Sequence, residues 1–351
     1  MLALDIGHPR MGGGRWEIAD MVTLARAAER AGIDTICMPE NAAIEEGWDA
    51  FVPLAAIALA TRTVRLSTSI VSIYTRTPLV VAKTVAALDQ ISRGRMVLGL
   101  GRGLPPALAA EGIASERPLT RMREFVEIVR RLLATGRGPY NGKTLSLGAE
   151  LRLGFRPHRR AIPIYLGAAG PRMLRLAGAI ANGVYLPTIA GRMAGFLEEA
   201  AHAVEEGARS AGRDPRSVKI IRSVYVSIAG TPAAARRRIA DLLLYHLSQP
   251  ALDAIIGHTP FTREIQELRE RMGRGDRKAA RSLVTPEMID FFALAGTRAH
   301  CRQELARGVP PRIDGTRLMP VGRTTREALT AALGLARAKR YDRPPAKGAD
   351  A

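Results

Sequence analysis

Short apolar runs alternate with longer amphipathic stretches along most of this 351-residue chain. The apolar runs are too short for buried helices and end at glycine, proline or polar residues, and the run from 64 to 71 is also rich in β-branched residues, which predicts strands. In the longer stretches the apolar residues recur at helical spacing. The pattern predicts strands at residues 1–6, 33–38, 64–71, 96–100, 162–167, 183–186, 218–228 and 316–320, with helices between them.

Eight strands separated by helices indicate an α/β fold with a parallel sheet. Because no break in composition divides the chain, we predict a single (β/α)8 TIM barrel domain at residues 1–340, although the pattern also allows an open, doubly wound sheet. Insertion segments interrupt this barrel. Asn141-Gly142 predicts a hairpin, and an arginine-rich stretch at about 249–290 predicts a charged helical insertion. The tail at 341–351 is predicted to be disordered.

The stretch from 64 to 103 shows the repeating unit most clearly. Its second strand runs into Gly99-Leu100-Gly101-Arg102-Gly103. The spacing G-x-G-x-G is not the G-x-G-x-x-G of a dinucleotide-binding turn, and Leu104-Pro105-Pro106 is expected to disfavour an immediate helix start. We interpret these glycines as places where the backbone comes close to a flat ligand or to a neighbouring strand.

In a (β/α)8 barrel the active site lies at the carboxyl ends of the strands. This rule places Glu40 and Asn41 on the rim, together with Ser69-Ile70 and the glycine run. The same rim carries Gly167-Ala168-Ala169-Gly170-Pro171-Arg172, the strongest candidate for binding a phosphate. Small residues let the backbone approach an anion, Pro171 suits the first helical position, and Arg172 offers a guanidinium fork. An ordinary tight turn is the alternative.

The chain is strongly basic, with 46 arginines among its 52 basic residues and a formal net charge of +19. This charge suits an anionic partner, but an arginine-biased proteome gives the same composition. Aromatic residues are 5% of the chain and no basic tract is interleaved with them, so we predict no binding to nucleic acid. No apolar run is long enough to cross a membrane and no signal peptide is expected, which together predict a cytoplasmic protein.

No motif in the chain supplies an obvious nucleophile or metal site. Cys37 and Cys301 fit neither a disulfide framework nor a metal-binding spacing, so we expect no metal. The histidines, His246 among them, show no paired spacing and are interpreted as surface or loop residues. G-x-S-x-G, H-E-x-x-H and P-loop patterns are absent. The chemistry is therefore expected to come from a bound cofactor.

Several blocks of the chain resemble the luciferase-like monooxygenase superfamily. The opening blocks are Thr75-Arg76-Thr77-Pro78 and Leu88-Asp89-x-x-Ser92-x-Gly94-Arg95, followed by the glycine run. Further blocks in the right order extend the resemblance from about Leu24 to Gly308. The similarity is closest to the branch that uses the deazaflavin coenzyme F420, which includes methylenetetrahydromethanopterin reductase.

The resemblance implies a barrel that binds FMN or coenzyme F420 at its C-terminal rim. In F420-dependent members a non-proline cis peptide bond after the third strand backs the deazaflavin ring, and Ser69–Ile70 matches that position. Glu40 and Asn41 become the catalytic candidates. The cofactor-binding candidates are Ser69, Ile70, Gly99, Gly101, Gly103, Gly167, Ala168, Ala169, Gly170, Pro171 and Arg172.

Two positions depart from the F420-dependent pattern. Glu40-Asn41 stands where several relatives have Asp-His, and Leu104 stands where the pterin reductase has an acidic residue. We therefore expect an oxidoreductase that moves a hydride between coenzyme F420 and an unidentified small organic substrate, acting as a homodimer or higher homo-oligomer. The alternatives are an FMN-dependent monooxygenase on the same barrel, and a degenerate barrel that binds a ligand or partner without turnover.

Overall fold

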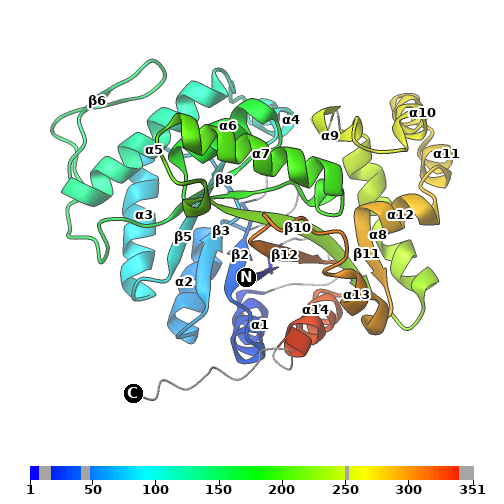
Figure 1. Ribbon diagram of the computed structural model, residues 1–351. Helices are drawn as coiled ribbons and strands as arrows, with labels where there is room; N and C mark the ends of the chain where they lie inside the picture. Colours follow the sequence, from blue (N-terminus) through cyan, green and yellow to red (C-terminus); the bar gives the residue numbers. More distant parts are fainter. Residues whose placement is uncertain (8–16, 41–47, 250–252, 340–351) are drawn as a thin grey trace.

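A computed structural model describes residues 1–7, 17–40, 48–249 and 253–339 of the chain. Eight parallel strands form a closed ring, in which β12 pairs with β1 and β9 pairs with β10 (Figure 1). The (β/α)8 TIM barrel is therefore confirmed, and the open sheet is excluded. The ring consists of β1 (Leu2–Asp5), β2 (Thr35–Met38), β3 (Arg65–Thr68), β5 (Met96–Gly101), β8 (Ile164–Gly167), β9 (Gly183–Tyr185), β10 (Lys219–Ile228) and β12 (Gly315–Pro320).

Helices cover the outside of the ring, and their ends follow from the local sequence. The helix α1 (Ile18–Ala31) ends at Gly32, which takes the left-handed φ of 81° that glycine adopts without strain. The helix α3 (Pro78–Ile91) begins after Thr77, whose side chain accepts a hydrogen bond from the Val80 N–H. The remaining helices of this layer are α2 (Phe51–Ala60), α5 (Pro118–Thr135), α6 (Pro171–Ile180), α7 (Ala194–Ser210), α8 (Pro232–Leu247), α13 (Arg298–Glu304), α14 (Thr325–Lys339) and the 3₁₀ turns η1 (Thr188–Ala190) and η2 (Pro215–Ser217).

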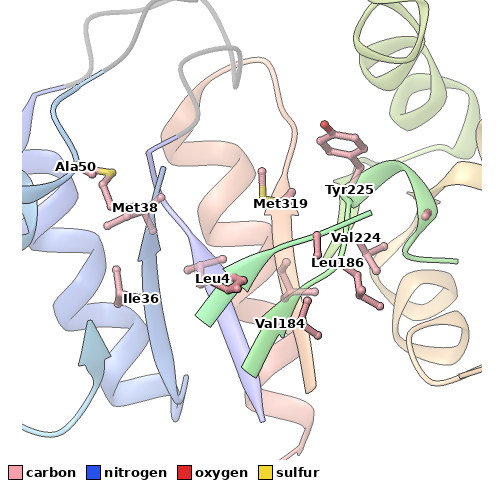
Figure 2. Close-up of a cluster of buried hydrophobic side chains, with 14 of the residues drawn as sticks. Leu4, Ile36, Met38, Ala50, Val184, Leu186, Val224, Tyr225 and Met319 are labelled. Atoms are coloured by element: carbon pink, nitrogen blue, oxygen red, sulfur yellow. The ribbon is translucent and has the colours of Figure 1, made fainter. Parts of the chain in front are cut away.

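Side chains along the strands alternate between the lumen of the barrel and the outer layer. Leu4, Ile36 and Val184 belong to the large apolar cluster that the helices cover (Figure 2). Cys37 and Tyr185, the neighbours of Ile36 and Val184 along the chain, belong to a smaller cluster inside the ring. The lumen is therefore a packed core, and its residues can be read from the strand register.

The third strand is broken where the sequence predicts continuity. The strand β3 ends at Thr68, the Ser69–Ile70 peptide bond is cis as the family resemblance implied, and β4 (Val71–Ser72) pairs with β5 instead of β2. The expectation of no immediate helix after Leu104 is wrong. The helix α4 (Pro105–Ala110) begins there. The N–H groups of a first helical turn have no partner within the helix, so the missing N–H of proline costs no hydrogen bond at these positions.

The insertions have the predicted types but include one strand that the pattern missed. The strands β6 (Tyr140–Asn141) and β7 (Ser146–Leu147) form the expected hairpin. The charged insertion contains α9 (Asp253–Ile256), α10 (Thr262–Gly273), α11 (Arg277–Ser282) and α12 (Pro286–Phe292). It ends in β11 (Ala293–Gly296), which pairs with β10 from Tyr225 onward, beyond the last residue that pairs with β9, Ile221. The predicted disordered tail lies outside the described residues.

The block from Asp89 to Arg95 lies at the end of the barrel opposite the rim. The buried Asp89 carboxylate accepts hydrogen bonds from the Met96 N–H at 3.2 Å and from the Arg159 Nε at 2.9 Å. The Arg95 guanidinium donates to the backbone carbonyls of Ala58, Thr61, Val64 and Ser92 at 2.7–3.0 Å. This block of the family pattern therefore joins α2, α3 and β5 and has no part in the rim.

Candidate active site

The carboxyl ends of β2, β3, β5 and β8 meet around Ile70. The Glu40 N–H donates to the Ile70 carbonyl at 3.2 Å, so the segments after β2 and β3 lie side by side. A Cβ added at Gly101 would lie 2.6 Å from the Ile70 side chain, and one at Gly167 would lie 3.2 Å from it. Ile70 is partly exposed and packs against the lumen cluster. Three of the candidate positions therefore form one apolar floor at the rim.

The glycines of β5 are explained by the neighbouring strand. A Cβ at Gly99 would lie only 2.1 Å from the Thr68 carbonyl oxygen. The Thr68 hydroxyl also donates to the Gly99 carbonyl and accepts from the Gly99 N–H, both at 2.8 Å. Gly103 has a φ of 78° and lies close to Ser72. Of the two readings of this run, a close approach to a neighbouring strand accounts for Gly99.

Polar side chains lie inside the barrel directly beneath the floor. The Arg317 Nη1 donates to the Ser69 carbonyl oxygen at 2.9 Å, and the Arg317 Nε donates to the Ser223 hydroxyl at 3.0 Å. The Ser69 hydroxyl donates to the Asp5 carboxylate at 3.2 Å. The Arg317 guanidinium also lies 5.1 Å from the centre of the Tyr185 ring. All five side chains are buried.

Sequence reasoning selected Ser69 but missed the other four residues of this group. Its signal was a charged residue inside an otherwise apolar strand, which occurs at Asp5 in β1 and at Arg317 in β12. Charged residues are rarely fully buried unless they are paired. The hydroxyl of Tyr185 shares a hydrogen bond of 2.8 Å with Ser67, and burial raises the pKa of Tyr185 well above its usual value. The phenol is therefore protonated at neutral pH.

Glu40 lies on the rim as expected, but its carboxylate is already engaged. The Arg76 Nε donates to Glu40 at 2.8 Å, and the Arg76 Nη2 binds both Glu40 and Asp49. Burial lowers the pKa of Arg76, but its bonds to the two carboxylates outweigh this and raise it. A catalytic role for Glu40 stays a prediction, and Asn41 lies outside the described residues.

The candidate phosphate turn opens α6. Gly170 is the N-cap with an ordinary φ of −78°, and Pro171 is the first helical residue, as predicted. The space around a Cβ at Gly170 is empty within 4 Å. The Arg172 side chain does not reach the centre of the barrel. It lies in a groove of about 1030 Å³ outside the ring, between α5, the hairpin, α6 and α7, with Arg123, Lys143 and Arg175.

The interpretation of His246 as a surface or loop residue is wrong. Its Nε2 lies 2.6 Å from the hydroxyl of Tyr225, and the imidazole is half buried near the end of α8. Tyr225 lies beside Met319 on the next strand (Figure 2). The two partners are 21 residues apart on a strand and a helix, so no local spacing reveals the pair. A phenol and an imidazole are thus coupled at the same end of the barrel.

The described residues form neither a membrane-spanning helix nor a cluster of metal ligands. Within them, no helix combines the length and the apolar character needed to cross a bilayer. In the same part of the chain, no group of three or more histidine, cysteine, aspartate or glutamate side chains is arranged to hold a metal ion.

Comparison with known proteins assigns this barrel to a family. The sequence profile of the luciferase-like monooxygenase family matches residues 2–314, so the chain belongs to that family and is an oxidoreductase of the luciferase-like class.

Among its relatives, the chain is 32% identical over 307 residues to a putative coenzyme F420-dependent oxidoreductase of Mycobacterium tuberculosis, covering 81% of this chain and 85% of the relative. It is 29% identical over 285 residues to 5,10-methylenetetrahydromethanopterin reductase of Methanolobus tindarius, covering 80% and 84%. The structure of the coenzyme F420-dependent tetrahydromethanopterin reductase from Methanopyrus kandleri superposes with a TM-score of 0.82 at 24% identity, covering 97% and 99% of the two chains. This last likeness establishes the fold alone.

Proposed function

We propose that the protein transfers a hydride between coenzyme F420 and a small organic substrate. The observation that carries this proposal is the apolar floor at the rim, where the partly exposed Ile70 side chain lies between Gly101 and Gly167. The names of two relatives, each covered over most of its length, include F420 dependence or pterin reduction. We carry over the coenzyme but not the pterin, because Leu104 departs from the pattern of the pterin reductase.

The floor fits one face of a flat tricyclic ring. Side chains at positions 101 and 167 would clash with Ile70 or stand above it, so the two glycines keep the surface level. When bound, the deazaflavin supplies the ring carbon that takes up or releases the hydride. The protein holds that ring against the substrate and keeps water away from it, which is the contribution expected of a cofactor enzyme.

The α6 turn fits the phosphate of the coenzyme. The open space at Gly170 leaves room for an anion, and the first N–H groups of a helix of ten residues attract negative charge. The groove beyond it contains Arg123, Lys143 and Arg172, whose charges suit the carboxylates of a glutamate tail. In this placement Ile70 would support the ring, and α5 and α6 would flank the anionic end of the coenzyme.

Titration of the purified protein with oxidised F420 and, separately, with FMN tests the proposal. We expect saturable quenching of F420 fluorescence and no comparable binding of FMN. Tight FMN binding without F420 binding would reverse the assignment in favour of a flavin monooxygenase. A screen of carbonyl and imine substrates with reduced F420, and of alcohols with oxidised F420, then follows the coenzyme absorbance. Binding without any turnover would favour the degenerate barrel.

A further inference from the structure

Arg317 occupies an unusual place for a charged side chain. It extends from β12 into the barrel lumen and is 6% exposed. The lumen of such a barrel is normally filled by bulky branched apolar side chains, and burying a guanidinium costs solvation free energy. The neighbours of Arg317 in the lumen are polar and include the buried Asp5 carboxylate, so its place is explained by these polar contacts and not by apolar packing.

The contacts of Arg317 converge on Ser69. Its Nη1 donates to the Ser69 carbonyl at 2.9 Å, while the Asp5 carboxylate accepts the Ser69 hydroxyl at 3.2 Å. Arg317 and Asp5 lie 3.9 Å apart, so their opposite charges partly neutralise each other. Ser223 and the Tyr185 ring hold the guanidinium from two further strands. The side chain therefore has one arrangement, and that arrangement fixes a backbone carbonyl directly before Ile70.

We propose that Arg317 is a positioning residue for the coenzyme: it holds the Ser69–Ile70 segment from inside the barrel and so sets the height and tilt of the floor on which the ring lies. This inference rests on the proposed function only for the identity of the ligand. The hold itself is a property of the protein alone.

Arg222 on the adjacent strand provides a matched control. It is 2% exposed and pairs in register with Thr316, the neighbour of Arg317 along the chain, so its side chain points to the outside of the ring. It donates to the Thr316 hydroxyl at 3.0 Å, to the Gly191 carbonyl at 2.9 Å and to the Leu305 carbonyl. Arg222→Met removes another buried arginine without touching Ser69; the difference is that Arg222 binds a hydroxyl and two carbonyls, whereas Arg317 also lies 3.9 Å from the Asp5 carboxylate.

The experiment compares Arg317→Met, Arg317→Lys and Arg222→Met in the full chain. Amide hydrogen exchange of the protein without coenzyme gives the first readout. Because the Ser69 N–H donates to Met38 and the Glu40 N–H donates to Ile70, we expect both amides to exchange faster in Arg317→Met and at wild-type rates in Arg222→Met. Unchanged exchange at both amides in Arg317→Met would overturn the inference, whatever the protein binds.

Equilibrium titration with oxidised F420 gives the second readout. We expect Arg317→Met to bind about tenfold more weakly or worse, with an altered absorption spectrum of the bound coenzyme, and Arg317→Lys to recover part of the affinity. Equal losses in Arg317→Met and Arg222→Met would assign the effect to general destabilisation and overturn the inference. If the wild type binds no F420, the proposed coenzyme is wrong, and the exchange data still decide the role of Arg317.

Discussion

The two ends of the barrel use charged side chains in opposite ways. At the amino ends of the strands, the side chains of Asp89, Arg95 and Glu29 form hydrogen bonds with backbone groups of neighbouring segments. These bonds join helices to strands. Near the carboxyl ends, Glu40, Arg76 and Asp49 are also paired, but Arg172 and its basic neighbours line an open groove outside the ring, and glycines lie against Ile70. Both ends carry blocks of the same family pattern. Blocks of one family pattern therefore stabilise the fold at the amino ends, and the proposed function assigns the blocks at the carboxyl ends to coenzyme binding.

The largest effect is expected from removing the Asp89 carboxylate at the amino ends of the strands. Asp89→Ala leaves Arg159 without its carboxylate and the Met96 N–H without its acceptor. Loss of a buried ion-pair partner is strongly destabilising, and since Arg159 is partly exposed we expect about 3 kcal/mol, measured by urea unfolding. Asp89→Asn keeps an acceptor and should lose less. Coenzyme affinity per folded molecule should not change in either variant, and a loss of affinity would contradict the division between the two ends.

A substitution in β5 should damage both stability and site. Gly99→Ala forces a methyl group against the Thr68 carbonyl, so β3 and β5 must separate. We expect a loss of about 1–3 kcal/mol on thermal unfolding, together with weaker coenzyme binding. For the unfolding measurement alone, Gly170→Ala is the matched control, because its φ is ordinary and the space around it is open. A melting temperature of Gly99→Ala equal to that of wild type would show that the close approach is not a constraint.

Substitutions at Arg172 and Gly170, near the carboxyl ends of the strands, should change the affinity for the coenzyme and leave the free energy of unfolding unchanged. Arg172→Ala should weaken F420 binding by about tenfold to a hundredfold if its charge-assisted bonds reach the coenzyme, and added salt should mask part of the loss. Gly170→Val should weaken binding by blocking approach to the helix N-terminus. Arg175→Ala, in the same groove but paired with Glu206 at 2.7 Å, serves as control. Wild-type affinity in both Arg172→Ala and Gly170→Val would move the phosphate elsewhere on the rim.

The smallest effect concerns pH. Burial would raise the pKa of Glu29, but the N–H groups of Thr63, Val64 and Arg62 outweigh it and lower the pKa to about 2 from 4.5. The bonds therefore stabilise the fold fully above pH 4.5, and this contribution disappears as the pH falls towards about 2. Because Glu29 is half-buried and solvent screens part of the interaction, we expect Glu29→Gln to cost about 1 kcal/mol at neutral pH. Unfolding curves of both proteins should converge in acid; a constant difference would rule out this linkage.

The ring of strands could be predicted because its signal is local. Most strands are short apolar runs and the helices between them keep their 3.6-residue period, so the alternation predicts the eight strands of the barrel. The strand β11 was missed because Ala293–Gly296 is short and consists of small residues apart from one leucine. The break after Thr68 was not visible either, since Ser69-Ile70 continues a β-branched pattern; only the family resemblance indicated it.

The candidate site was predictable as a set of strand ends and not as a set of contacts. The rule that barrel sites lie at the carboxyl ends selected Ile70, Gly101 and Gly167, which the structure brings together. Arg317 and Ser69 are 248 residues apart. Their contact depends on the register of the strands, which cannot be predicted from local sequence patterns. The sequence predicts that Arg172 lies in the first turn of a helix, and it does. The direction of its side chain depends on how α5 and the hairpin pack, which no local pattern indicates.

The pairing of β11 has a consequence for which segment of the chain can be exchanged without breaking the ring of strands. The ring closes through β9, β10 and β12, and β11 joins the sheet only along the last residues of β10, from Tyr225 to Ile228. The segment from α9 to β11 thus joins the sheet through one strand only and otherwise packs mainly against α8, so none of its backbone hydrogen bonds closes the ring. Chimeras that exchange this segment between relatives should therefore keep the hydrogen-bonded ring, and thermal unfolding should show a loss of stability only where the donor segment lacks the contacts with α8, such as the Arg236–Asp290 ion pair.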